Sequence, residues 1–320
     1  MLDRRGILAG AGAMLASAAR AQPAWPDRPI RLLVGFPAGG PTDFAARLLQ
    51  EPLQGLWGQP LVVENRPGAS QTIATEALAK SPPDGNTLLL CTSNLTTNPA
   101  VFSRLPYDTF RDITPLVIIY SSPTMLFTGP DQPYRGVADV VEAARRRPGM
   151  AAATSGVATS GHFATEMFMR AAGIELTHVP YRGAVPALQD VMGGRVPITF
   201  STLSGAIALA RDGKLRPIGV AAPRRTKAFP DVPTMAEQGV PIRDTSPWYS
   251  FVAPAGLPQP IIDRIVGDVQ GLLRRPDIVA RVEESGGVVE GEGPAEFRAR
   301  IPREIAVNTE VARIASIHIE

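Results

Sequence analysis

Short strand-like runs alternate with segments of helical periodicity along most of this chain, and this alternation constrains the fold more than any other feature. The ten apolar, strand-like runs are IRLLVGF, LVVEN, NTLLLC, TPLVIIY, TMLFTG, MAAATSG, THVPYRG, VPITFST, LRPIGVA and WYSFVAP. Between most of them lie segments with apolar residues at helical spacing, namely DFAARLLQEPLQGLW, TIATEALAKS, VADVVEAARRR, HFATEMFMRAAG, AVPALQDVMGG and SGAIALARDG. This alternation predicts an α/β fold with parallel sheets covered by helices. From Gln259 onward the pattern is helical, with one short strand at GGVVEGE.

The first residues have the organisation of an export signal. Two arginines at positions 4 and 5 precede an apolar run over residues 6–19, and a small-x-small cleavage site, ARA, ends at residue 21. We therefore predict a signal peptide over residues 1–21 and a mature chain that begins at Gln22. The apolar run is too short for a membrane anchor, and the arginine pair allows both the general secretory and the twin-arginine export routes. The remaining length of about 300 residues suggests two domains.

Charge and composition exclude several classes of partner. The predicted signal holds three arginines against one aspartate and so accounts for the whole net charge of +2, which leaves 29 basic and 29 acidic residues. A neutral exported chain carries no electrostatic footprint for nucleic acid or an anionic membrane. The single cysteine, Cys91, ends the run NTLLLC and is predicted to be a buried strand residue. With three histidines and no H-E-x-x-H motif, we expect neither a metal site nor a cofactor.

The stretch IRLLVGFPAGGPTDFAARLL, residues 30–49, passes from a strand through a Pro/Gly-rich loop into a helix. A transition of this kind leaves backbone N–H groups free to hold an anion. A Walker-type phosphate loop would need a Lys followed by Ser or Thr, and a dinucleotide site would need G-x-G-x-x-G, but neither spacing is present. Two alternatives remain for the loop, a small-anion site and a tight βα turn without a ligand.

Nine ordered motifs cover residues 26 to 300 approximately, and they are VGFPAGGPTDFAARLL, GQPLVVENRPGAS, PDGNTLLLCTSN, RLPYDTFRDITPL, SGVATSGHFATEMF, THVPYRGAVPALQDVMGGRV, GKLRPIGV, FPDVPTMAEQGVP and FVAPAGLPQPIIDRI. Together they resemble the Bordetella uptake gene family, the extracytoplasmic receptors of tripartite tricarboxylate transporters. The resemblance implies a type II periplasmic-binding-protein fold, in which two α/β lobes are joined by two crossing strands and enclose a ligand cleft. With those strands near TMLFTG and WYSFVAP, lobe one would span residues 22–124 plus 247–320, and lobe two residues 125–246.

The resemblance also implies a function. The expected protein is a periplasmic, monomeric receptor that captures a small organic carboxylate and delivers it to the membrane permease subunits of the transporter. A ligand-dependent signalling receptor without its own permease is an alternative that the sequence does not separate from transport. A serine hydrolase is less favoured, because Ser160 and His162 are two residues apart on a helix and no G-x-S-x-G elbow occurs. A catalytic set assembled from distant residues stays open, since sequence order does not constrain it.

In the family, backbone amides of the first strand–helix loop hold a ligand carboxylate. Carried over by motif, the contacts in lobe one are Phe36, Ala38, Gly39, Thr42 and Asp43, with Ser93 and Asn94 from the loop TSNLTTN. Asp43 would repel an anionic ligand, so a role at the helix start or as a loop anchor is favoured for it.

The matching loop of lobe two lies in the segment AAATSGVATSGHFATEMF. Its predicted contacts are Ser155, Gly156, Thr159, Ser160, Gly161 and His162, with Tyr181 at the cleft edge after the next strand. Small side chains let an anion approach the amides, and the hydroxyl groups are neutral donors. Thr159 or Ser160 fits an N-cap role as well, a histidine in a first helical turn is more often structural, and Arg182 is as readily explained by solvation.

The chain departs from the family pattern after Phe200. Many relatives have an aspartate following this phenylalanine, whereas Ser201 and Thr202 stand here. An aspartate there can pair with a ligand ammonium, but hydroxyl groups are neutral. We therefore predict that Ser201 and Thr202 contact a ligand without an amine, an aliphatic or aromatic mono- or dicarboxylate. The alternative is that the two hydroxyls only line the end of the strand.

Overall fold

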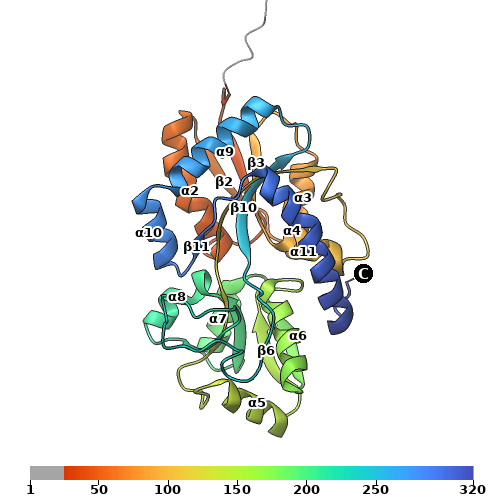
Figure 1. Ribbon diagram of the computed structural model, residues 1–320, viewed down its shortest axis with the longest axis vertical. Coiled ribbons are helices and arrows are strands. Elements are labelled where there is room, and N and C mark those ends of the chain that lie inside the picture. Colours follow the sequence, from red (N-terminus) through yellow and green to blue (C-terminus); the bar gives the residue numbers. More distant parts are fainter. Residues whose placement is uncertain (1–24, 320) are drawn as a thin grey trace, which may run out of the picture.

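The computed structural model describes residues 25–319 and consists of two α/β lobes, one above the other in Figure 1. This confirms the predicted fold class. The signal peptide predicted over residues 1–21 lies outside the described residues. Between residues 25 and 319, no helix is long and apolar enough to cross a lipid bilayer.

The sheet of lobe one has the strand order β11-β4-β10-β3-β1-β2. Its strands are β1 (Ile30–Val34), β2 (Leu61–Asn65), β3 (Thr87–Thr92), β4 (Ile113–Ser121), β10 (Trp248–Pro254) and β11 (Val288–Val289). Alternate residues pack on opposite faces. Leu32 lies in the core formed with α2 (Pro41–Trp57) and α9 (Gln259–Leu273), and Leu33 in the core formed with α3 (Thr72–Ala79) and α11 (Pro294–Ala315). Burial on both faces explains why these strands are continuous apolar runs.

Cys91 lies in β3 and is fully buried, as predicted. Burial raises the pKa of its thiol to about 12. The thiol therefore stays protonated and serves as a small apolar core side chain.

The sheet of lobe two has the order β7-β6-β8-β5-β9. Its strands are β5 (Thr124–Thr128), β6 (Met150–Thr154), β7 (Leu176–Pro180), β8 (Ile198–Thr202) and β9 (Arg216–Val220). One face packs on α5 (Val137–Arg146) and α6 (Ser160–Ala172), and the other on α7 (Ala184–Met192) and α8 (Leu203–Arg211). All the strand-like runs of the sequence are thus strands in the structure.

Both sheets are mixed, so the prediction of parallel sheets was wrong for three strands. β10 runs antiparallel to β3 and β4, β11 runs antiparallel to β4, and β5 runs antiparallel to β8 and β9. The chain passes from one lobe to the other immediately before β5 and before β10, so each of these two enters its sheet from the cleft side. The strands that enter from the outer edge end at the cleft instead. Hydrophobic periodicity carries no information about strand direction.

A helix, α4 (Asn94–Val101), replaces the loop predicted at TSNLTTN. Its sequence NLTTNPAV has weak helix propensity and contains a proline. The helix is stabilised by tertiary contacts, because Asn98 Nδ2 donates to Ser70 O at 2.9 Å and Thr96 Oγ1 donates to Glu304 Oε2 at 2.9 Å. Such contacts between distant residues are invisible to a local pattern. Helix α10 (Pro276–Glu284) and the short 3₁₀ turn η1 (Ala69–Gln71) complete the fold.

The two connections between the lobes lie side by side. Ser122, which follows β4, donates its N–H to Pro247 O at 3.1 Å, just before β10. The start of α8 is attached to the same place, since Leu203 N donates to Pro123 O at 2.8 Å and Ser204 N to Ser122 Oγ at 3.0 Å. These two connections, around Ser122–Pro123 and Pro247, form the hinge between the lobes. The hinge and the first turn of α8 are thus joined by hydrogen bonds.

Candidate ligand-binding site

Several helices begin at the cleft between the lobes. Helices α2, α4, α6, α7 and α8 follow strands β1, β3, β6, β7 and β8, whose carboxyl ends point into the cleft. This is the place where open α/β sheets bind ligands. The helix starts surround a pocket in which the centres of water-sized spheres have about 50 Å³ of free space.

The backbone at three of these helix starts is free to donate hydrogen bonds. The N-cap residues of α2, α6 and α7 are Gly40, Thr159 and Gly183. In the described part of the chain, no N-cap side chain accepts a hydrogen bond from the first N–H groups of these three helices. Thr159 Oγ1 donates instead to Gly156 O at 2.7 Å. All three N-cap residues line the pocket. The first N–H groups of each helix lack intrahelical acceptors, and the helix dipoles add partial positive charge.

The pocket brings together ten of the predicted contact residues, namely Phe36, Ala38, Thr42, Ser93, Asn94, Ser155, Thr159, Ser160, Ser201 and Thr202. Their side chains are apolar, hydroxyl or amide groups. Within the described part of the chain, no charged residue lines this pocket. An anion entering it meets only neutral donors, and an ammonium group would find no carboxylate. The contacts themselves stay predictions.

One lining residue of the pocket carries a buried polar atom with unused hydrogen-bonding capacity. Thr202 is 9% exposed, and among the described residues its Oγ1 has no hydrogen-bond partner. Tyr249 lines the pocket beside it and stacks on Tyr120, with ring centroids 4.7 Å apart. Burial raises the pKa of both phenols, so they stay neutral donors. A buried hydroxyl without a partner destabilises the protein, and a ligand oxygen would relieve that cost.

Asp43 lies outside the pocket lining and anchors the first loop. Its carboxylate accepts hydrogen bonds from Gly39 N at 3.0 Å, Arg47 Nε at 2.8 Å and Asn65 Nδ2 at 3.2 Å. Burial by itself raises the pKa of Asp43, but these hydrogen bonds outweigh it and hold the pKa below its ordinary value. The loop-anchor role therefore describes Asp43. The same contact occupies the amide of Gly39, which removes that amide from the predicted donors.

Gly161 is close-packed rather than open to a ligand. A Cβ atom on Gly161 would lie 2.3 Å from Phe200 O in β8, and Gly161 does not line the pocket. The glycine lets α6 approach the sheet, so the expectation that it gives an anion access to the amides is not supported.

We expect Gly161→Ala to lower the free energy of unfolding by about 1–3 kcal/mol, because the added methyl group overpacks a backbone contact that cannot relax easily. Urea denaturation of the mature protein measures this. Ser160→Ala, one residue earlier and outside this contact, is the matched control. Equal stability of the two variants would contradict the close-packing role.

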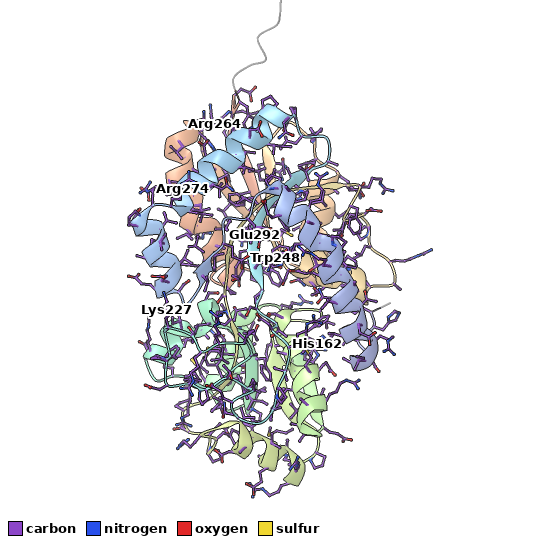
Figure 2. All side chains as sticks on the ribbon, viewed as in Figure 1. His162, Lys227, Trp248, Arg264, Arg274 and Glu292 are labelled. Atoms are coloured by element: carbon purple, nitrogen blue, oxygen red, sulfur yellow. The ribbon has the colours of Figure 1, made fainter. Side chains whose placement is uncertain are left out.

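His162 supports the backbone of the lobe-two loop. Its Nδ1 accepts a hydrogen bond from Ala158 N at 3.2 Å, and its ring stacks on His178 with centroids 3.9 Å apart. Figure 2 shows His162 at the end of α6 that faces lobe one. His162 does not line the pocket, and no hydrogen bond to Ser160 occurs among the described contacts. These contacts give His162 a structural role, and a contact of His162 with a ligand stays a prediction. The Ser160–His162 pair has no nucleophile–base geometry.

The stacked histidines predict an acid-sensitive fold. Burial and, secondarily, the His162 ring lower the pKa of His178 from 6.5 to about 3. Between those pH values the unfolded chain binds a proton at His178 that the native state does not, so the free energy of unfolding falls as the pH falls. His178→Asn lacks this titration. From pH 7 to pH 4 its unfolding free energy, measured with urea, should fall less than that of the wild type, and parallel losses would refute the assignment.

Gly156 and Tyr181 line a second, larger cavity of about 720 Å³, together with Arg182. Phe36, Pro37, Ser155 and Gly183 border both cavities. Tyr181 Oη donates to Asp190 Oδ2, a contact that raises the pKa of the phenol. The Tyr181 hydroxyl is thus used within lobe two, and Tyr181 also packs against the core formed with α7 and α8.

Sequence reasoning missed part of the pocket wall. The additional lining residues are Pro37, Gly40, Pro41, Thr92, Gly183, Ala184, Val185, Pro186, Pro247 and Tyr249. A signal for the α7 start was present, because GAVPA follows a strand with the same small-residue pattern as PAGGP and TSG. Pro247 and Tyr249 come from the hinge, and no local pattern assigns them to the cleft.

Lobe-one side chains bind the loop that precedes α6. Ala158 O accepts hydrogen bonds from Asn94 Nδ2 at 3.3 Å and from Thr97 Oγ1 at 2.9 Å, and Val157 O accepts one from Ser70 Oγ. Ala158 has a left-handed φ of 59°. These contacts link the two lobes across the cleft and fix the N-terminus of α6 relative to lobe one.

No group of three or more His, Cys, Asp and Glu side chains with the arrangement of a metal site exists between residues 25 and 319.

Comparison with known proteins gives a consistent assignment. The family model described as the tripartite tricarboxylate transporter family receptor matches residues 45–292. Protein BugT of Bordetella pertussis is 34% identical, with 93% of this chain and 94% of BugT covered. A Rhodopseudomonas palustris protein, MatC, solved with bound malate, is 28% identical with a TM-score of 0.85 over 90% of this chain and 99% of MatC. An R. palustris structure with adipate is 35% identical with a TM-score of 0.89 over 92% of this chain and 99% of that one.

Proposed function

This chain belongs to the tripartite tricarboxylate transporter receptor family, and we propose that it captures a small organic carboxylate without an amine. In this proposal the protein, like the periplasmic solute-binding receptors of its family, delivers the carboxylate to the permease subunits of such a transporter. In this proposal, residues 1–21 direct export by the general secretory or twin-arginine route. The mature protein acts as a monomer, with lobe one over residues 22–124 plus 247–320 and lobe two over residues 125–246.

The observation that carries this proposal is the composition of the pocket. Three uncapped helix starts converge on it, and all the residues that line it in the described chain are uncharged. Helix N-termini favour anions. A site built from them, without a lysine or an arginine, suits a carboxylate held by neutral donors.

The energetics of such a site are adequate. A micromolar dissociation constant corresponds to about 8 kcal/mol. Hydrogen bonds to a charged group contribute roughly 1.5–3 kcal/mol each, and a helix terminus about 0.3–2 kcal/mol more. Four to six such contacts therefore cover the binding free energy and part of the ordering cost. An arginine clamp is not required.

The relatives support dicarboxylates as the first ligands to test. One similar structure contains malate and another adipate, and both ligands carry two carboxylates and no amine. In this chain the α2, α6 and α7 starts would hold one carboxylate, and Thr202 and Tyr249, which also line the pocket, would contact a second polar group.

A thermal-shift screen followed by calorimetry tests the proposal. The mature protein would be titrated with malate, succinate, adipate, citrate and benzoate beside aspartate and glutamate. A ligand at 100 times its dissociation constant should stabilise the fold by about 2.7 kcal/mol. Stabilisation by at least one amine-free carboxylate is the expected result. Stabilisation by none of them, or turnover of an ester by the purified protein, would overturn the proposed function.

A further inference from the structure

Across the cleft, two glycines of lobe two lie against two proline rings of lobe one. A Cβ atom on Gly205, in the first turn of α8, would lie 3.2 Å from Pro41 Cδ at the start of α2. A Cβ atom on Gly183 would lie 3.2 Å from Pro37 Cδ. These separations are tighter than ordinary carbon contacts. The lobes therefore approach at these points as closely as the absence of a side chain permits.

Gly205 differs from Gly183 because its backbone does not require glycine. Gly183 has a φ of 115°, which side chains rarely tolerate. Gly205 is helical and outside the left-handed region, and alanine is the better helix former at such a position. Local conformation thus gives no reason for glycine at 205, whereas the contact with Pro41 does.

Gly205 lies in a helical turn that is fixed to the hinge, so its contact with Pro41 affects how the lobes approach each other. The two residues before it, Leu203 and Ser204, are hydrogen-bonded to the hinge at Pro123 and Ser122. On the other side, Leu203 packs against lobe one, because a Cβ on Gly286 would lie 2.3 Å from Leu203 Cδ2. The first turn of α8 is therefore held between two surfaces of lobe one, and it has little freedom to shift away from Pro41.

We infer that Gly205 is a positioning residue that sets how far the cleft closes and, through this, which ligand length the pocket accepts. This inference rests on the proposed carboxylate-receptor function. Pro41 lines the ligand pocket, so the ring that Gly205 contacts is also part of the pocket wall. With a side chain at 205 the pocket becomes wider, and contacts to short ligands lengthen.

Gly205→Ala tests the inference, with Gly267→Ala as its matched control. Gly267 lies inside α9, and a Cβ there meets no atom within 4 Å in the described structure. Gly267→Ala should raise the melting temperature of the ligand-free protein, because alanine favours the helix. Gly205→Ala should raise it less, because the added methyl group also meets the Pro41 ring. Only Gly205→Ala should weaken succinate binding, by roughly threefold to tenfold, with a smaller loss for adipate. Gly205→Leu should enlarge the difference between the two diacids.

A double variant separates a specific contact from general damage. In Pro41→Ala/Gly205→Ala the added methyl group no longer meets a ring, so the combined loss of affinity should be smaller than the product of the two single losses. Unchanged succinate and adipate affinities in Gly205→Ala, or equal losses for both diacids with no coupling to Pro41, would overturn the inference. If the wild type binds none of the amine-free carboxylates, the proposed function fails. In that case X-ray scattering of the ligand-free wild type and of ligand-free Gly205→Ala tests the role of Gly205. The variant should have a larger population of the open form, and identical scattering profiles of the two proteins would refute the inference.

Discussion

Replacing Ser160 by aspartate is expected to weaken carboxylate binding by roughly 100-fold to 1000-fold. Ser160 is the first residue of α6 and lines the pocket. Two like charges about 4 Å apart repel each other by about 4 kcal/mol at an effective dielectric constant near 20, and tenfold in affinity corresponds to about 1.4 kcal/mol. The new carboxylate would also attract the helix N–H groups that the ligand needs. Calorimetric titration with the ligand that binds the wild type best measures the effect.

Ser160→Asn is the matched control for this prediction, since it has nearly the same shape as aspartate and no charge. Aspartate in the first turn favours the helix dipole, so Ser160→Asp should keep the melting temperature of the ligand-free protein. Loss of binding without loss of stability would locate the ligand carboxylate at the α6 start. Equal affinity of the aspartate and asparagine variants would place the carboxylate elsewhere in the cleft.

The strands and their order along the chain could be predicted from the sequence because most of them are buried on both faces. A residue such as Leu33 and its neighbour Leu32 both face a core, so each strand is an uninterrupted apolar run. Helix α4 was missed because its stability depends on contacts such as that of Thr96 with Glu304, more than 200 residues away. Strand direction was wrong for β5 and β10, since it is decided by where the chain crosses between the lobes.

The site was predicted at the level of loops, and less well at the level of single residues. A strand end followed by small residues and a helix start locates an anion-binding turn from local sequence alone. Within such a turn, successive residues point in different directions. Asp43 turns inward to Asn65 and Gly161 packs on Phe200, so both have roles set by partners far away in the sequence. Ser160, between Thr159 and Gly161, faces the pocket.

Ser201→Asp is expected to reverse the ligand preference between a diacid and its amino derivative. Aspartate is succinate with an added amine, and glutamate is glutarate with one, so each pair isolates the ammonium group. Ser201 lines the pocket and is 8% exposed, and Asp43 is engaged by Arg47, Asn65 and the Gly39 amide. In the wild type an ammonium therefore lacks a carboxylate partner. The amino acid should bind about 10- to 100-fold more weakly than the matching diacid, which corresponds to a lost charge-assisted contact of roughly 1.5–3 kcal/mol.

The Ser201→Asp variant supplies that partner. The new carboxylate should repel the diacid and pair with the ammonium of the amino acid, so the diacid loses affinity while the amino acid gains it. Ser201→Asn, with the same shape and no charge, should keep the preference of the wild type. Calorimetry measures the affinities of succinate against aspartate and of glutarate against glutamate for the wild type, Ser201→Asp and Ser201→Asn. The prediction of an amine-free ligand would be refuted if the wild type bound aspartate more tightly than succinate, or glutamate more tightly than glutarate. The neutral hydroxyls of Ser201 and Thr202 would then favour the ligand with the ammonium group.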